Sequence, residues 1–134
     1  MNETRTEHLA VGEWGEGVAM EALRQTGFLI LASRIRFGPR EELDIVARDG
    51  DTLVFVEVKT RRGESFGRPI AAVNRAKRET VSRAAVHYLR KLGFPRVFIR
   101  FDVVEVVGER GDNLPRVRHV RNAFTMDTRY RLPY

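Results

Sequence analysis

Small and apolar residues recur at helical spacing near the start of the chain and predict a first helix over residues 6–26. Gly27 follows at the position where a glycine commonly ends a helix. Four small side chains fall on one face of this helix, and such a face suits close packing on a sheet. They are Gly12, Gly15, Ala19 and Ala22.

Three strands are predicted next, over residues 28–36, 42–48 and 52–59, where apolar and alternating patterns replace the helical one. Asp49-Gly50-Asp51 separates the second strand from the third. Gly and Asp tolerate the positive φ of tight hairpin turns, so these two strands are expected to form a hairpin. The pattern does not decide whether the two-residue turn is Asp49-Gly50 or Gly50-Asp51.

A second amphipathic helix is predicted over residues 72–91, followed by strands over 97–107 and 116–124. The order of elements is therefore helix, three strands, helix, two strands. This order favours a mixed sheet with helices packed on it, in the α/β or α+β class. The apolar stripe expected on the second helix comprises Val73, Ala76, Thr80, Val81, Ala84, Ala85 and Tyr88.

The composition narrows the class of protein. A length of 134 residues suits one domain, which we place at 1–134. The absence of cysteine excludes a disulfide scaffold, a thiolate zinc site and a cysteine nucleophile. The longest apolar run, residues 28–32, is far short of the ~20 residues that span a bilayer. The first residues do not form a secretory signal, so we expect a cytoplasmic protein with no membrane association.

The positive charge is concentrated in one part of the chain. The formal net charge is +6, and residues 65–100 alone carry 9 basic and 1 acidic side chains. A concentrated basic stretch is typical of a nucleic-acid-binding surface, although a solvated helix face gives the same pattern.

Two carboxylates meet on the predicted hairpin. Side chains on a strand alternate between its faces, so either turn places Asp44 and Glu57 on the same face of the sheet. Neighbouring carboxylates repel each other unless a cation lies between them. Hard oxygen ligands suit Mg²⁺, and Lys59 on the same face would assist an attacking water or neutralise charge on phosphorus. The alternative is a surface hairpin in which the lysine pairs with an acid.

Two helical residues add to this arrangement. Lys77 falls inside the apolar stripe of the second helix, where a charge either snorkels to solvent or points at an anionic site. Glu16 lies beside the small-residue face of the first helix, from which its side chain is able to reach the sheet.

Together these residues resemble the PD-(D/E)xK nuclease superfamily, whose fold is restriction-endonuclease-like. The signature is Asp44, twelve residues, then Glu57-Val58-Lys59, with Gly15-Glu16 on a preceding helix. More specifically, most of the chain looks like the YraN-like family of small bacterial proteins with a predicted endonuclease fold. The other matching pieces include Glu42-Leu43, Phe66-Gly67, Ala72-Val73 with Lys77, Arg100-Phe101-Asp102-Val103-Val104 and Asn122-Ala123-Phe124.

The resemblance implies a central mixed five-stranded sheet flanked by helices. It also implies a catalytic site of Glu16, Asp44, Glu57 and Lys59, in which Asp44, Glu57 and Glu16 would hold Mg²⁺ or Mn²⁺. The layout resembles archaeal Holliday-junction resolvases, which points to branched or structured DNA. The chain departs from the family in two places. Glu41 stands where a glycine is usual, and an asparagine common in the preceding strand is replaced, near Arg34.

We therefore expect a metal-dependent endonuclease that acts on nucleic acid, most simply DNA, and forms a homodimer if its substrate is two-fold symmetric. The alternatives are a non-catalytic nucleic-acid-binding module on the same fold and a protein whose basic surface meets an acidic partner. The residues expected to contact the nucleic-acid backbone are Arg61, Arg62, Arg75, Lys77 and Arg78.

Overall fold

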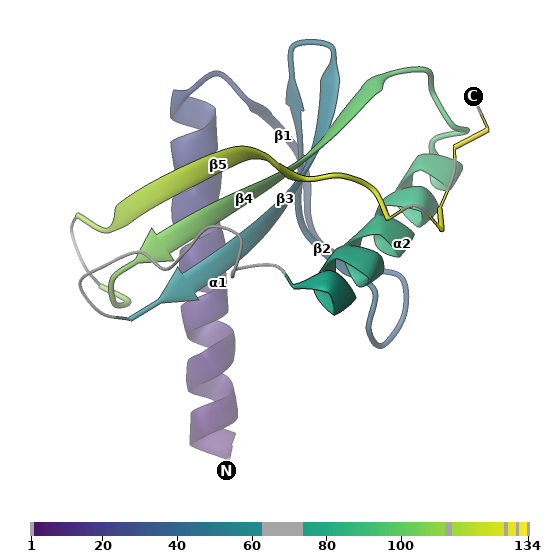
Figure 1. Ribbon diagram of the computed structural model, residues 1–134. Coiled ribbons are helices and arrows are strands. Elements are labelled where there is room, and N and C mark those ends of the chain that lie inside the picture. The colour runs from purple at the N-terminus through teal and green to yellow at the C-terminus, as the bar shows by residue number, and fades with distance from the viewer. Residues whose placement is uncertain (1, 63–73, 112–113, 128, 131, 134) are drawn as a thin grey trace.

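A five-stranded sheet with a helix on each face forms the framework of the protein (Figure 1). The computed structural model describes residues 2–62, 74–111, 114–127, 129–130 and 132–133. None of the helices among these residues is long and apolar enough to cross a membrane. The elements are α1 (Asn2–Gln25), β1 (Leu29–Arg36), β2 (Glu42–Asp49), β3 (Thr52–Arg61), α2 (Arg75–Lys91), β4 (Phe98–Val107) and β5 (Arg116–Phe124).

The strands lie in the sheet in chain order, from β1 to β5. β3 and β4 are parallel and α2 belongs to the connection between them, whereas the other neighbouring strands are antiparallel. The predicted mixed sheet of the α/β class is thus confirmed, and its form is consistent with a restriction-endonuclease-like fold. The predicted bounds were wrong at several ends, most of all for α1, which begins at Asn2. The expected start of the second helix, residues 72–73, lies outside the described residues.

α1 packs against one face of the sheet through its small residues. Ala19 and Leu23 are fully buried there against Ile45, Val54 and other residues of the central strands. Gly15 faces Thr60, and a Cβ at Gly15 would overlap the Thr60 Oγ1 atom and lie 3.2 Å from its Cβ. The small-residue face predicted from the sequence therefore brings the helix backbone directly onto β3.

α2 covers the opposite face, where the aromatic rings of the core lie. Phe55 stacks on Phe101 with ring centroids 5.5 Å apart, and Phe101 stacks on Phe124 at 4.9 Å. The predicted stripe of α2 is confirmed at three buried positions and wrong at Ala76, which is exposed because it lies in the first turn of the helix, at the rim of this core. The buried residues of α2 are Val81, Ser82, Ala84, Ala85 and Leu89.

The hairpin between β2 and β3 turns at Gly50-Asp51. Asp49 pairs with Thr52, and Gly50 adopts the positive φ of +61° that such a turn requires. The same register pairs Ile45 with Val56 and, one residue further, sets Asp44 opposite Glu57. Of the two turns that the sequence left open, the structure has the one that places these carboxylates directly across from each other.

A buried carboxylate joins β4 to its neighbours. Asp102 has no exposed surface, and Arg100 donates to both of its oxygens at 2.8 and 3.0 Å. His119 Nε2 lies 2.7 Å from Asp102 Oδ2, and the backbone N–H of Asn122 donates to Oδ1 at 2.9 Å. Asn122 has a positive φ of +52° within the irregular part of β5, so this carboxylate fixes the distortion of the edge strand.

The segment after β5 crosses α2. The backbone N–H of Asp127 donates to the buried hydroxyl of Ser82 at 2.9 Å, and Arg83 Nε donates to the Tyr130 hydroxyl at 2.9 Å. Leu132 packs against the core under α2. The last described residues therefore hold α2 on the sheet.

Candidate metal and nucleic-acid site

Three of the four predicted catalytic residues line one cavity. Asp44 from β2 and Glu57 and Lys59 from β3 surround a space of about 380 Å³, together with Asn74 and Lys77 at the start of α2. The fourth residue, Glu16, reaches Asp44 from α1 on the other side. Asp44 therefore lies between Glu16 on one side and the cavity-lining residues Glu57 and Lys59 on the other.

Asp44 lies where β2 and β3 separate. The last paired residues of the two strands are Ile45 and Val56, so the N–H of Val58 is able to donate to Asp44 Oδ2, at 2.9 Å. Burial raises the pKa of Asp44, and this backbone hydrogen bond opposes the rise. The hydrogen bond from the Val58 N–H fixes the orientation of the Asp44 carboxylate. A fixed orientation suits a metal ligand, which must be in place before the ion binds.

Glu57 is the most deeply buried acid of this cavity, with only 5% of its surface exposed. Its Oε2 lies 3.4 Å from Lys77 Nζ, whereas its Oε1 is buried without a hydrogen-bond partner among the described residues. Burial and then the neighbouring charge of Asp44 raise the pKa of Glu57 to about 8, while Lys77 opposes the shift. An additional cation would stabilise the charged form of this carboxylate.

The acidic group on the other side of Asp44 comprises Glu16 and Glu42. One carboxylate oxygen from each of these three residues lies within 4.8 Å of the others. Glu16 is buried, and this burial raises its pKa even though Arg34 Nε donates to it at 2.5 Å. Glu42 pairs with Arg36 at 3.2 Å. The carboxylates of Glu16, Glu42 and Asp44 thus lie close together, and Arg34 and Arg36 pair with the first two of them.

The predicted lysines differ in their surroundings. Lys59 is exposed beside the cavity and makes no ion pair with any of the described residues. Lys77 points from α2 to Glu57, as its position in the helical pattern indicated. Burial lowers the pKa of Lys77, but Glu57 and Asp44 outweigh this effect and raise it overall, so its ammonium stays charged.

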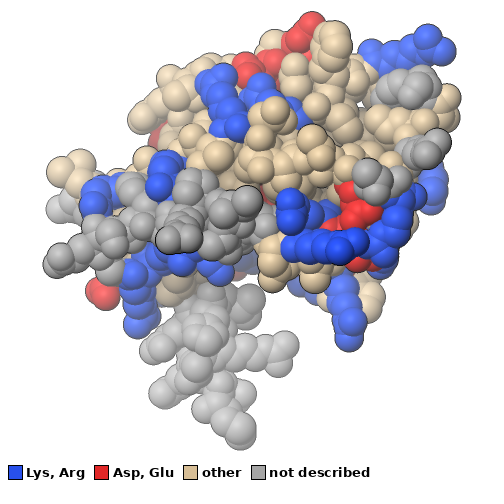
Figure 2. Space-filling model, viewed as in Figure 1, with Lys and Arg blue, Asp and Glu red and all other residues tan. Residues whose placement is uncertain are grey.

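The residues predicted to contact the nucleic-acid backbone differ in their exposure and in their partners, and only Lys77 among them lines this cavity. Arg62 and Arg75 are exposed, and Arg78 lines a shallow pocket with Arg75 and Arg129. Arg61 lies 3.4 Å from the fully buried Glu105, so part of its charge is satisfied within the sheet. Figure 2 shows basic side chains interleaved with acidic ones over the α2 side of the molecule.

Some charges of the basic segment serve the fold instead. Arg83 pairs with Glu79 at 3.3 Å and with Glu41 at 3.6 Å, and Arg100 holds Asp102. The excess of positive charge in residues 65–100 is therefore only partly available to an outside partner.

Two residues beside Asp44 were not identified as site residues from the sequence. Glu42 shares a strand face with Asp44 at a spacing of two, and this alternation was the signal that would have found it. Arg34 was marked in the sequence only as a departure from the family's usual asparagine, and its contact with Glu16 was not predicted because it joins β1 to α1 over a separation of 18 residues.

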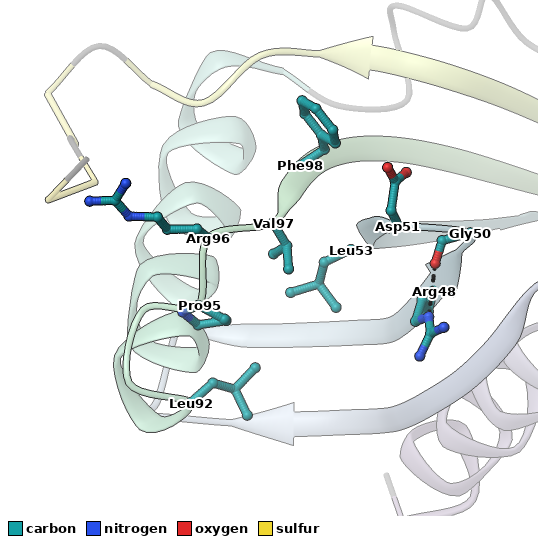
Figure 3. A pocket seen from close by; sticks show the side chains of 9 residues that line it. All are labelled: Arg48, Gly50, Asp51, Leu53, Leu92, Pro95, Arg96, Val97 and Phe98. Atoms are coloured by element: carbon teal, nitrogen blue, oxygen red, sulfur yellow. Dashed lines mark hydrogen bonds between the residues drawn. The ribbon is translucent and has the colours of Figure 1, made fainter.

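A larger cavity, of about 900 Å³, lies far from the carboxylates. It is bounded by the β2–β3 turn, the end of α2 and the start of β4, and its walls include the exposed Phe98 and Leu92 (Figure 3). No group of three metal-binding side chains is found there among the described residues. The candidate chemistry therefore belongs to the smaller, polar cavity at Asp44.

Comparison with known proteins gives matches over most of the chain. The model of the uncharacterised protein family UPF0102 matches residues 15–106. A UPF0102 protein of Symbiobacterium thermophilum is 49% identical over 115 residues, which cover 85% of this chain and 95% of that protein. UPF0102 proteins of Syntrophotalea carbinolica and Rhodococcus jostii are 47% and 42% identical, over 90% and 87% of this chain and 96% and 98% of their own lengths.

Proposed function

Because the chain belongs to the uncharacterised protein family UPF0102, the YraN family, we propose its activity from its own site: divalent-metal-dependent hydrolysis of phosphodiester bonds in DNA. The resemblance to the YraN-like family is confirmed by the comparisons, whereas nuclease activity is our inference. The observation that carries it is the convergence of Asp44 with Glu16 on one side and Glu57 and Lys59 on the other.

The residues fit a hard divalent cation. All of the candidate ligands are carboxylate oxygens, which Mg²⁺ and Mn²⁺ prefer, and Glu57 Oε1 is buried with no hydrogen-bond partner among the described residues. Asp44 would be the central ligand, and Glu16 and Glu57 would be the flanking ones. When bound, the ion would polarise the phosphodiester and help to ionise the attacking water.

The side chains would divide the remaining work. Lys59 is exposed beside the cavity, where its ammonium would orient the attacking water or stabilise negative charge on the phosphoryl oxygens. Lys77 would contact a phosphate next to the reacting one. Arg62, Arg75 and Arg78 would hold the nucleic-acid backbone without reading its sequence. Branched or structured DNA is the first substrate to test, since the layout resembles junction resolvases.

The test is a cleavage assay with Mg²⁺ or Mn²⁺ on single-stranded, duplex, flapped, four-way-junction and RNA substrates. Asp44→Asn keeps the shape of the side chain and an acceptor for Val58 N–H, so we expect it to fold and bind DNA but to lose cleavage. We expect Lys59→Ala to lose most of its activity as well. Asp51→Asn, which removes an exposed carboxylate at the hairpin tip, is the matched control and should cleave normally.

Full cleavage by Asp44→Asn would contradict the proposal. Nucleic-acid binding that weakens with salt and does not depend on Mg²⁺, together with no cleavage of any substrate, would instead favour a non-catalytic nucleic-acid-binding module.

A further inference from the structure

The larger cavity, of about 900 Å³, is an apolar groove whose walls are exposed to solvent. Leu53 of the hairpin, Leu92 after α2, and Val97 and Phe98 at the start of β4 line it (Figure 3). Leu92, Val97 and Phe98 are 50%, 37% and 70% exposed, and they are three of the six exposed large apolar side chains among the described residues. Single exposed apolar residues are ordinary, whereas a contiguous apolar patch is typical of a binding surface.

The fold holds the walls of this apolar groove in place. Leu53 is buried and pairs with Ile99 of the parallel strand β4. Arg48 Nε donates to the backbone oxygen of Gly50 at 2.8 Å, which ties the hairpin turn to β2. After α2 the N–H of Phe94 donates back to the oxygen of Leu89 at 2.8 Å. The apolar surface is therefore formed before any partner binds, which lowers the entropic cost of binding.

The cations at the rim of the apolar groove are available to an outside partner. Arg48 and Arg96 line it, both are exposed, and neither forms an ion pair with any of the described residues. Arg90 and Lys91 add positive charge in the last turn of α2. Of the residues that line the groove, only Asp51 is acidic. The surface thus complements a partner that combines apolar groups with negative charge.

The apolar groove and the candidate catalytic cavity lie at opposite ends of α2. Lys77, in the first turn of the helix, lines the catalytic cavity, whereas Leu92 follows the last turn and lines the groove. The 17 residues of α2 correspond to a length of ~25 Å. No residue lines both spaces. A molecule bound in the groove would therefore leave the carboxylates accessible.

A second copy of the chain and a nucleic acid fit the apolar groove less well than a protein segment does. A two-fold contact between copies would bring the Arg48 and Arg96 side chains of both copies together, and like charges repel. A nucleic-acid strand would supply phosphates to these arginines, but its backbone offers nothing to the aliphatic walls. Phe98 is the only aromatic lining residue on which a base could stack.

We propose that the apolar groove is a docking site for an acidic segment of another protein. The apolar side chains of this segment enter the groove, and its carboxylates meet Arg48 and Arg96. Phe98 is the principal contact, because it is the most exposed apolar residue of the groove and aromatic side chains dominate many interfaces. The inference goes beyond the proposed function and does not depend on it, since the groove and the catalytic cavity share no residue.

The test begins with the selection of short random peptides, displayed on phage, against the purified chain. We expect the enriched peptides to combine apolar side chains with Asp or Glu. Fluorescence anisotropy of the most enriched peptide then compares variants. Phe98→Thr removes the ring and keeps a residue that favours strands, so it should fold and bind at least tenfold more weakly. Arg96→Ala should bind roughly two- to fivefold more weakly and should be less sensitive to salt.

Leu29→Thr and Arg24→Ala are the matched controls. Leu29 is an exposed apolar residue at the first position of a strand, as Phe98 is, but it lies outside the apolar groove. Arg24 is an exposed arginine in the last turn of α1. Both controls should bind the peptide as the unaltered chain does. Thermal melts report folding, and Val97→Thr, which keeps the shape of its side chain, tests the same wall if Phe98→Thr does not fold.

The outcomes decide between the possible occupants of the apolar groove. The proposal is overturned if selection enriches no peptide, if the enriched peptides lack Asp and Glu, or if Phe98→Thr binds them as tightly as the unaltered chain. Self-association in sedimentation that Phe98→Thr abolishes would assign the groove to a second copy and overturn it. DNA that competes with the peptide and binds Phe98→Thr weakly would assign the groove to nucleic acid and overturn it too. A failure of the cleavage assay would leave this inference standing.

Discussion

At the scale of the residue, the candidate site depends on a close contact between Gly15 and Thr60, where a Cβ would force its surroundings to shift. Gly15 and Glu16 are neighbours on α1, and the packing of Gly15 on Thr60 determines how near Glu16 comes to Asp44. An extra methyl group at Gly15 would push the helix away from the sheet, and the carboxylate would move with it. The small residue therefore serves both the packing of α1 and the geometry of the acidic group.

Gly15→Ala and Gly17→Ala should have opposite effects on stability. We expect Gly15→Ala to lower the free energy of unfolding by about 1–3 kcal/mol, because the new Cβ overlaps Thr60. A Cβ at Gly17 has no atom within 4 Å, so Gly17→Ala should stabilise the helix by up to about 1 kcal/mol. Urea denaturation measures both. Equal effects at the two positions would show that the close approach to Thr60 is unimportant.

At the scale of the element, the sequence predicted the features that neighbouring residues determine and missed those that depend on tertiary contacts. The hairpin followed from Asp49-Gly50-Asp51, since a tight turn is encoded by the residues within it. The direction of Lys77 followed from the helical period. The Arg34–Glu16 pair could not be predicted from the sequence. β1 contains an irregularity between Ile30 and Ala32 that shifts its register, and no local sequence pattern reveals this irregularity.

The distortion of the edge strand β5 could not be predicted from the sequence either, because it depends on contacts with another strand. The extra residues of β5 opposite β4, and the positive φ of Asn122 among them, depend on Asp102 in the neighbouring strand. Asp102 itself was visible only as a polar residue inside an apolar strand. Its three partners come from β4 and β5 and are separated from it by as many as 20 residues.

Replacement of Asp102 should destabilise the protein in a pH-dependent way. Burial alone would raise its pKa, but the hydrogen bonds from His119, Arg100 and Asn122 outweigh this and hold its pKa below the ordinary value of 3.8. The carboxylate therefore stabilises the folded state above pH 3.8, and this contribution is lost as the pH falls through the lower folded value. The Asp102→Asn substitution should lower the free energy of unfolding by about 1.5–3 kcal/mol at pH 7.

Denaturation curves for Asp102→Asn and the unaltered chain, collected from neutral to acidic pH, provide the measurement. The difference between them should be constant near neutrality and should narrow in acid. Asp51→Asn, at the exposed hairpin tip, is the control and should differ little at any pH. A difference that widened in acid would contradict the assigned direction of the pKa shift.

At the scale of the whole molecule, the formal charge of +6 overstates the surface offered to a nucleic acid. Arg83 and Arg100 are held by carboxylates within the fold, whereas Arg75 and Arg78 line a separate pocket between α2 and the segment after β5. The count of charges along the sequence predicted a basic region. Only the fold separates the arginines that hold the protein together from those that remain for a partner.

Arg78→Ala and Arg83→Ala should therefore differ in their effect on DNA binding. A phosphate contact contributes about one unit to the slope of log affinity against log salt concentration. We expect Arg78→Ala to reduce that slope by about one and to keep normal stability. Arg83→Ala should leave the slope nearly unchanged and should lower the melting temperature, because Arg83 contacts Tyr130 and Glu41. Fluorescence anisotropy over a salt series, with thermal melts beside it, distinguishes them.

The segment that crosses α2 has a consequence for how the protein is made. Asp127, Tyr130 and Leu132 are synthesised after α2, yet they hold that helix; Asp127 follows Ser82 by 45 residues and Tyr130 follows Arg83 by 47. A growing chain still attached to the ribosome has β3 and α2 available, but not the strand and the final contacts that complete them. The docking of α2 is therefore complete only after the segment that follows β5 has been synthesised.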